Sequence, residues 1–396
     1  MIEIDSLPVI DVHCHPFADT GPLTPAQFVE RLSFPGGSTP FMVEGGVADD
    51  GSLAGELQSL REHTVFFRSA LRLLAQFLGC EAELATVVAA RNQAVQADYR
   101  GYLRRLFAAG HIVALIADMG YPQPAIDLER FRQDVPIPVF PVYRIEPLIA
   151  ELLAADIGWE EFRRRFDETL AHALAQGGYR GLKSIIAYRT GLDISPLSRT
   201  PDQGQQALEA IRRGTGGQAT KKLRDHLLCR ALELCRDHDV PMQIHTGIGD
   251  YEVNLALCRP ALLLDLLRAP AFRACRVVLV HTGYPYHAEA GYMAGVLPRV
   301  YCDISQGVPF AAHGARRILH QVLEMAPYSK VLYGSDSYSL PEANYLGAIL
   351  ARMALRQVLS DLTQDGLFSA AEADEAARLI LAENARALYR LEEGPA

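Results

Sequence analysis

Short apolar runs, most of them followed by a stretch with helical spacing, recur along the whole chain. The runs are rich in β-branched residues and almost continuously hydrophobic, as is typical of strands buried on both faces of a sheet. We expect eight strands, which span residues 7–15, 111–120, 137–145, 181–189, 241–247, 276–283, 299–305 and 330–336. This alternation predicts an α/β fold, a closed (β/α)₈ TIM barrel. Pro138 and Pro141 interrupt the third run, which makes it the least regular strand.

Three segments extend beyond a minimal barrel. Residues 36–105 begin with PGGSTP and continue with amphipathic spacing, which predicts a helical insertion after the first strand. Residues 190–220 are polar and rich in glycine, and we expect a long loop there before a helix at 223–236. The final stretch, AEADEAARLILAENARALYRL, predicts an amphipathic helix. We expect residues 1–396 to form a single barrel domain.

Composition narrows the classes of function. The chain has 396 residues, of which 49% are hydrophobic and 21% charged, and its net charge of -9 argues against a nucleic-acid surface. The seven cysteines form no C-x-x-C pair, which indicates reduced thiols. The N-terminus lacks the basic region of a signal peptide, and no apolar run is long enough to span a membrane. We therefore expect a cytoplasmic protein that acts on a small molecule. No feature specifies an oligomer, although the helical insertion offers a surface for a homo-oligomer.

The strongest local feature is His13-Cys14-His15 at the end of the first predicted strand. Alternate residues of a strand face the same side, so His13 and His15 should project together, with Asp11 one step below them. Cys14 should face the helices. Two imidazoles at this spacing form half of a metal site, although such pairs also arise by chance.

Three further strands end in potential ligands. His245, His281 and Asp336 each close an apolar run. In a barrel these positions meet at the C-terminal rim, where active sites lie. One rim histidine alone is often structural, and one rim aspartate is often a helix cap. Several histidines and a carboxylate on four strands favour a divalent metal, with Zn²⁺ first and Mn²⁺ or Fe²⁺ as alternatives.

This ordered set resembles the amidohydrolase superfamily, in its family-2 branch. The phrases QIHTGIGD, LVHTGYPYHAEA and VLYGSDSYSLPEANYLGA resemble the amidohydrolase domain fused to glutamine-synthetase-like proteins, and the resemblance runs from residue 7 to about 390. It implies that His13 and His15 hold the first metal. It also implies that His245 completes the site or helps to hold a second metal. Asp336 would bind metal or its water and move the proton.

Lys183, in the fourth predicted strand, decides between one metal and two. In binuclear relatives a strand-four lysine is carboxylated and bridges both ions, whereas a free ammonium would repel a dication. Lys183 could therefore be carboxylated, be an unmodified site residue, or point to the helix layer and away from the site. His281 would join His245 on a second ion, or act on substrate or water beside a single ion.

Weaker candidates follow the strands. Arg189 could bind a substrate carboxylate, or form a surface ion pair. Tyr284 and His287 could line a pocket after the sixth strand, and Asp303 could orient a ligating histidine.

Three functions stay open. The first is a metal-dependent hydrolase that cleaves an amide or ester of a small, carboxylate-bearing molecule. The second is a mononuclear-metal decarboxylase of the same superfamily, and the third is a barrel that binds without catalysing. The sequence holds no G-x-G-x-x-G motif after a strand, no Walker A motif and no G-x-S-x-G motif, so nucleotide-cofactor and serine-hydrolase chemistry are not suggested.

Overall fold

Eight parallel strands form the centre of the molecule. The computed structural model describes residues 3–33, 42–43 and 46–391. The strands follow one another around the sheet in the order of the sequence. They are β1 Val9–Cys14, β2 Ile112–Asp118, β3 Val139–Arg144, β4 Leu182–Ser184, β5 Met242–His245, β6 Val277–Val280, β7 Val300–Asp303 and β8 Val331–Leu332. The eight predicted strands and the TIM-barrel class are confirmed.

Backbone hydrogen bonds join the residues after β8 to β1. Val12 N donates to Tyr333 O at 3.0 Å, and Asp336 N donates to His13 O at 2.8 Å. These bonds bring the last strand beside the first and draw the sheet into a nearly closed barrel. Because all strands are parallel, their carboxyl ends share one rim.

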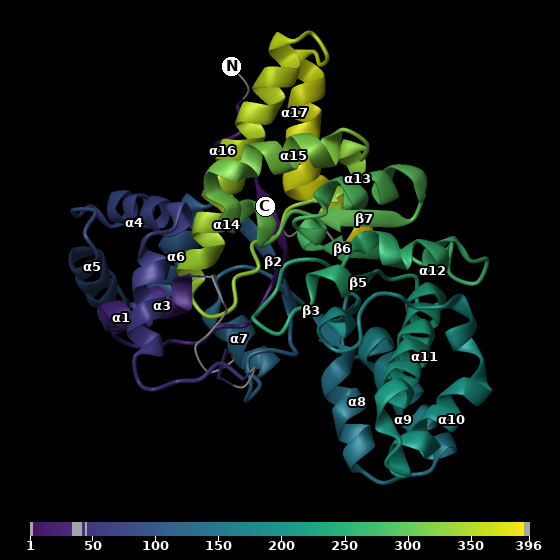
Figure 1. Cartoon of the computed structure of the whole chain (residues 1–396). Helices are drawn as coiled ribbons and strands as arrows, with labels where there is room; N and C mark the ends of the chain where they lie inside the picture. The colour runs from purple at the N-terminus through teal and green to yellow at the C-terminus, as the bar shows by residue number, and fades with distance from the viewer. Residues whose placement is uncertain (1–2, 34–41, 44–45, 392–396) are drawn as a thin grey trace.

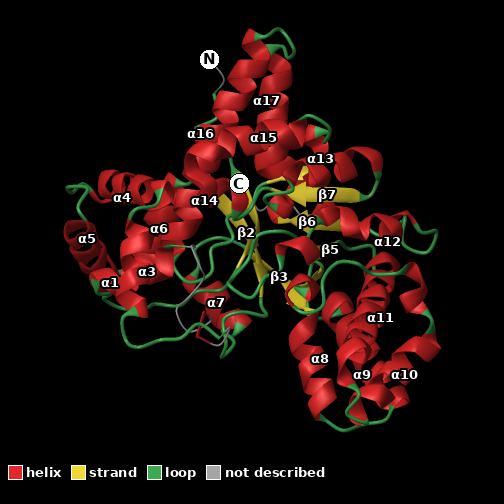
Figure 2. Cartoon of the chain, in the orientation of Figure 1, coloured by secondary structure: helices red, strands yellow, loops and turns green. Residues whose placement is uncertain are grey.

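Helices surround the strands, as Figure 2 shows in red around yellow. Before β2 the chain forms α1 Pro25–Leu32, α3 Leu53–Glu62, α4 Val65–Leu78, α5 Leu84–Ala97 and α6 Tyr99–Ala109. The middle of the chain adds α7 Leu128–Asp134, α8 Ile145–Ala154, α9 Trp159–Ala175, α10 Pro201–Arg212, α11 Gly216–Asp237 and α12 Leu264–Arg268. The remainder contributes α13 His287–Val296, α14 Gly307–Ala311, α15 Ala315–Leu323, α16 Pro341–Gln364, α17 Ala370–Arg378 and α18 Asn384–Tyr389. Within the described ranges, no helix is both long and apolar enough to cross a bilayer.

The helices before β2 form a group of their own beside the barrel (Figure 1). Their buried side chains pack against α16, where Leu340, Tyr345 and Leu346 complete a shared apolar cluster. An ion pair between Arg91 and Glu342, both buried, crosses this cluster at 2.8 Å. The predicted helical insertion is therefore present, and a second core fastens it to the barrel. Its predicted residues 36–41 and 44–45 lie outside the described residues.

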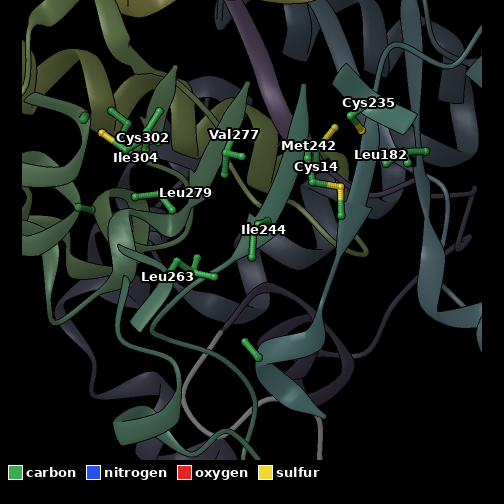
Figure 3. Packing of buried hydrophobic residues seen from close by; sticks show 14 of the residues in the cluster. Cys14, Leu182, Cys235, Met242, Ile244, Leu263, Val277, Leu279, Cys302 and Ile304 are labelled. Atoms are coloured by element: carbon green, nitrogen blue, oxygen red, sulfur yellow. The ribbon is translucent and has the colours of Figure 1, made fainter. Parts of the chain in front are cut away.

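Two apolar layers hold the barrel together. The outer layer lies between strands and helices and includes Cys14, Met242, Leu279 and Cys302 (Figure 3). The inner layer fills the barrel with branched side chains, and α18 closes it with Ala385, Leu388 and Tyr389. The inner members from the strands are Ile10, Val12, Ala114, Ile116, Val142, Val278, Val280 and Leu332. The buried polar residues His13, His245 and Asp336 lie at or just after the carboxyl ends of the strands, above this layer.

One expectation about secondary structure needs correction. The long loop predicted over 190–220 contains α10, and α11 begins inside the same range. The polar composition belongs to the exposed face of α10, whose Ala207 and Leu208 are buried. The third predicted strand is present as β3, and Pro141 within it accepts from Arg180 N through its carbonyl oxygen at 2.8 Å.

Asp11 does not face the same side as His13. The register of β1 against β2 shifts between Asp11 and Cys14, so simple alternation fails at this point. Asp11 instead accepts hydrogen bonds from Ser335 N and from Asn344 Nδ2, both at 2.9 Å. Its carboxylate joins β1 to α16 and to the segment after β8, outside the site.

Candidate metal centre

His13 and His15 converge on one carboxylate. The Nε2 atoms of His13 and His15 lie 3.2 Å and 3.4 Å from Asp336 Oδ1. All three residues are buried. Both imidazoles face Asp336, as the His-x-His spacing predicts.

Asp336 is the ionised centre of the cluster. Burial alone would raise its pKa, but the neighbouring imidazoles of His281, His13 and His15 hold the pKa well below its usual range. Its backbone has a φ of 57°, the left-handed region that a non-glycine residue rarely adopts, and His281 has a φ of 70°. Such strained backbone is often found where side chains must be aimed at a reaction centre.

His245 and His281 form a second pair. His281 Nε2 lies 3.1 Å from His245 Nδ1. Burial lowers the pKa of both rings well below the usual histidine value, so both are neutral near pH 7. In the described chain, His245 Nε2 is buried and has no hydrogen-bond partner.

Asp303 contacts His281 both directly and through Ser305. Ser305 Oγ donates to Asp303 Oδ1, which also accepts from His281 N at 3.0 Å. Because the hydroxyl proton of Ser305 is used there, its oxygen must accept from His281 Nδ1 at 2.8 Å. His281 Nε2 then carries a lone pair, which faces His245 Nδ1.

Lys183 lies inside the cluster, which rules out the helix-facing alternative. The residue is 1% exposed, and its Nζ is 3.3 Å from His13 Nε2. Burial is the main cause that lowers the pKa of this amine to about 8. The lysine is therefore far easier to deprotonate than one in water.

An ion pair at the ends of β2 and β3 is absent from the sequence-based candidates. Arg144 Nη2 and Nε bind Asp118 Oδ2 at 2.6 Å and 2.9 Å. Asp118 O also lies 3.3 Å from His15 Nδ1. Arg144 pairs in register with Lys183, so the guanidinium belongs to the same rim. The available signal was an acid and a base that each end a predicted strand.

Two of the three predicted substrate-binding residues lie side by side, because the ring centroids of Tyr284 and His287 are 5.8 Å apart. Arg189 is exposed just after η1 Ile186–Tyr188, and Tyr284 is half-buried after η5 His281–Gly283. His287 is buried at the start of α13, and its Nε2 contacts Gln321 Oε1 on α15. The ring of His287 is thus engaged with the helix layer.

Aromatic rings unforeseen from the sequence flank the histidines. The ring of Tyr188 lies 4.6 Å from that of His245, and the ring of Tyr121 lies 5.4 Å from that of His15. Tyr188 also accepts a hydrogen bond from Asp250 N at 3.0 Å, and burial is the main cause that raises the pKa of Asp250 to about 6. These groups form one wall of the rim.

Comparison with known proteins decides the family. The amidohydrolase family model matches residues 158–391, more than half of the chain. This chain belongs to the amidohydrolase superfamily. A curated relative of this amidohydrolase, Protein fluG of Emericella nidulans, is 33% identical over 365 residues, which cover 83% of this chain and 41% of that protein. The chain therefore spans about two fifths of the length of that relative.

Solved structures agree with the fold. A protein described as a metal-dependent hydrolase from Lactobacillus casei has a TM-score of 0.82 and 26% identity, with 98% of this chain and 96% of that chain covered. Glucuronate isomerase from Caulobacter crescentus has a TM-score of 0.63 and 15% identity, with 99% and 93% covered. The second likeness shows the barrel alone.

The residues of this amidohydrolase fit a divalent cation. His13, His281 and Asp336 each offer a ligand atom, and these atoms lie within 4.8 Å of one another. The unpartnered His245 Nε2 adds a further buried nitrogen donor. Imidazole and carboxylate ligands of this kind suit Zn²⁺, Mn²⁺ or Fe²⁺.

Proposed function

We propose that this amidohydrolase is a metal-dependent hydrolase that cleaves an amide or ester bond of a small, carboxylate-bearing molecule. The observation that carries the proposal is Asp336, a buried and ionised carboxylate held by His13 and His15 beside His281. Hydrolysis needs a base for the attacking water at this position, and a carboxylate supplies one. The similarity to a metal-dependent hydrolase structure supports the same class.

His13, His15, His245, His281 and Asp336 would hold the cation. A bound divalent ion lowers the pKa of its water to roughly 7 and polarises a carbonyl. Zn²⁺ is the proposed ion, because imidazole nitrogens predominate in the cluster.

Asp336 would move the proton. Its carboxylate accepts a proton from the attacking water as the water oxygen bonds to the substrate carbonyl carbon. The resulting carboxyl group then donates this proton to the leaving nitrogen or oxygen as the C–N or C–O bond breaks. The contacts of His13 and His15 with Asp336 Oδ1, at 3.2 Å and 3.4 Å, would keep the carboxylate in place in both steps.

The proposed partner of the substrate carboxylate is Arg189, whose exposed guanidinium follows η1 near the rim. Arg144 is less available, because two of its nitrogens already bind Asp118. Tyr284 and His287 remain proposed pocket residues.

Lys183 would carry a carboxylate group taken from CO₂. Its buried amine has a lowered pKa and contacts His13 Nε2, so the neutral form that attacks CO₂ is accessible and the product faces the cluster. The new C–N bond forms as the amine loses a proton. A ¹³C resonance that appears with ¹³C-bicarbonate in the wild type, and is missing from Lys183→Met, would support carboxylation. A spectrum without that resonance would favour an unmodified lysine and a single metal.

Turnover of amides, esters and lactones tests the function. Protein loaded with Zn²⁺ should hydrolyse at least one class, and Asp336→Asn should lower kcat/KM by about 10² to 10⁴-fold. Asp127→Asn is a matched control, because Asn can replace Asp127 as the cap of α7. Unchanged turnover in Asp336→Asn would contradict the proton-transfer role. Release of CO₂ from unsaturated or aromatic acids, without any hydrolysis, would favour the decarboxylase instead.

A further inference from the structure

Gln243 lies inside the barrel directly beneath the histidine cluster. It is fully buried in β5, two residues before His245, and its Cα is in register with Lys183. The surrounding inner layer is otherwise apolar, and a buried amide there must satisfy its hydrogen bonds within the protein. The hydrogen bonds of this amide determine which ring nitrogen of His13 carries the hydrogen.

The orientation of the Gln243 amide is fixed by Val12. Gln243 Nε2 donates to Val12 O at 2.8 Å, and it lies at the same distance from Tyr389 OH. Val12 O can only accept, so a flipped amide would bring two oxygen acceptors together. Gln243 Oε1 must therefore be the atom 3.0 Å from His13 Nδ1.

We propose that Gln243 is a positioning residue that holds His13 as the Nδ1–H tautomer. Because Gln243 Oε1 can only accept, His13 Nδ1 must carry the hydrogen. The lone pair of neutral His13 is then on Nε2, the atom that faces Asp336 at 3.2 Å. An imidazole oriented in this way is ready to bind a metal through Nε2.

Tyr389 extends the same arrangement to the C-terminal helix. It lies on α18, is 2% exposed, and contacts the second N–H of Gln243. Without the Tyr389 hydroxyl, the second N–H of Gln243 would have no hydrogen-bond partner inside an apolar layer. The helix that closes the bottom of the barrel is thus joined through Gln243 to a histidine of the rim.

The tautomer of His13 can be read by long-range ¹H–¹⁵N NMR of metal-free protein with ¹⁵N-labelled histidine, with His13→Gln used for assignment. The wild type should show Nδ1–H at His13, and Gln243→Met should show Nε2–H, the form that neutral imidazole favours in water. Gln243→Glu should retain Nδ1–H, because a buried neutral carboxyl group also offers one donor and one acceptor. An Nε2–H signal in the wild type would overturn the inference, even if a variant does not fold.

Zn²⁺ affinity provides an independent readout. In competition with a chromophoric chelator, Gln243→Met should bind Zn²⁺ about 10- to 100-fold more weakly than wild type. Gln243→Glu and Tyr389→Phe keep an acceptor opposite His13 Nδ1 and should lose less. Equal affinity in Gln243→Met and wild type would contradict the positioning role. The tautomer readout does not depend on the proposed hydrolysis, so the two ideas can fail separately.

Discussion

The two histidine pairs of the site are held in different ways. His13 and His15 share one oxygen of Asp336, at 3.2 Å and 3.4 Å. His245 and His281 face each other at 3.1 Å, and the other ring nitrogen of His281 contacts the hydroxyl of Ser305, which donates to Asp303. The pair on β1 is anchored by an ionised group, whereas the pair on β5 and β6 rests on neutral contacts.

This difference indicates that the two histidine pairs contribute unequally to metal affinity. A pair of imidazoles that already faces a common carboxylate loses little freedom when a cation binds, so less ordering is needed on binding. The buried His245 Nε2, which lacks a hydrogen-bond partner in the described chain, gains its partner only from a bound group. We expect the β1 pair to dominate metal affinity and the second pair to adjust it.

Substituting one histidine of each pair should show most clearly that the two pairs contribute differently to Zn²⁺ affinity. His13→Ala should weaken Zn²⁺ binding by more than about 100-fold, above the range for residues that only orient ligands. His245→Ala should lose less. Competition with a chromophoric chelator measures the Zn²⁺ affinity of both variants. His226→Gln is a control, because His226 is also buried but contacts Ser198 O, outside the histidine cluster. Equal losses of Zn²⁺ affinity in His13→Ala and His245→Ala would contradict the unequal contributions of the two pairs.

Lys183→Met should stabilise the protein when it is free of metal and Lys183 is not carboxylated. The pKa of Lys183 falls from 10.5 to about 8 on folding, which corresponds to a cost on the order of 3 kcal/mol at pH 7. Between pH 8 and 10.5 the unfolded chain keeps this proton while the folded chain releases it, so wild-type stability should gain a rising contribution with pH in that window. Urea unfolding of the Met variant should show a higher midpoint at pH 7 and lack this contribution. A lower midpoint at pH 7 would mean that the charge of Lys183 stabilises the fold.

The smallest expected effect concerns the neutral contacts of the second pair. Ser305→Ala removes the group that orients His281, and Zn²⁺ affinity should fall by about 10-fold. Ser198→Ala, at another buried serine, should leave the affinity unchanged. An equal effect of the two variants would show that Ser305 acts only through stability.

The sequence predicts the barrel and the rim ligands because both depend on local pattern. Apolar runs determine where the strands lie. Parallel strands then bring four residues to one end of the barrel regardless of the loop sequences, namely His13, His245, His281 and Asp336. Asp11 shows the limit, because a register shift inside β1 reverses the side that alternation assigns.

Contacts between elements that are far apart in the sequence could not be predicted from the sequence. Gln243 looks like an ordinary strand residue until β1 and α18 are placed beside it. Arg144 and Asp118 meet only because β2 and β3 are neighbours. The α10 helix was missed since its exposed face carries the polar residues that also mark loops.

Metal content tests the central claim most directly. Elemental analysis of purified wild type and of a His13→Ala, His15→Ala double variant would report divalent metal per chain. The account predicts at least one equivalent in the wild type and essentially none in the double variant, with Asp127→Asn equal to the wild type. A wild type that binds no metal after incubation with Zn²⁺, Mn²⁺ or Fe²⁺, or a double variant that retains a full equivalent, would contradict it.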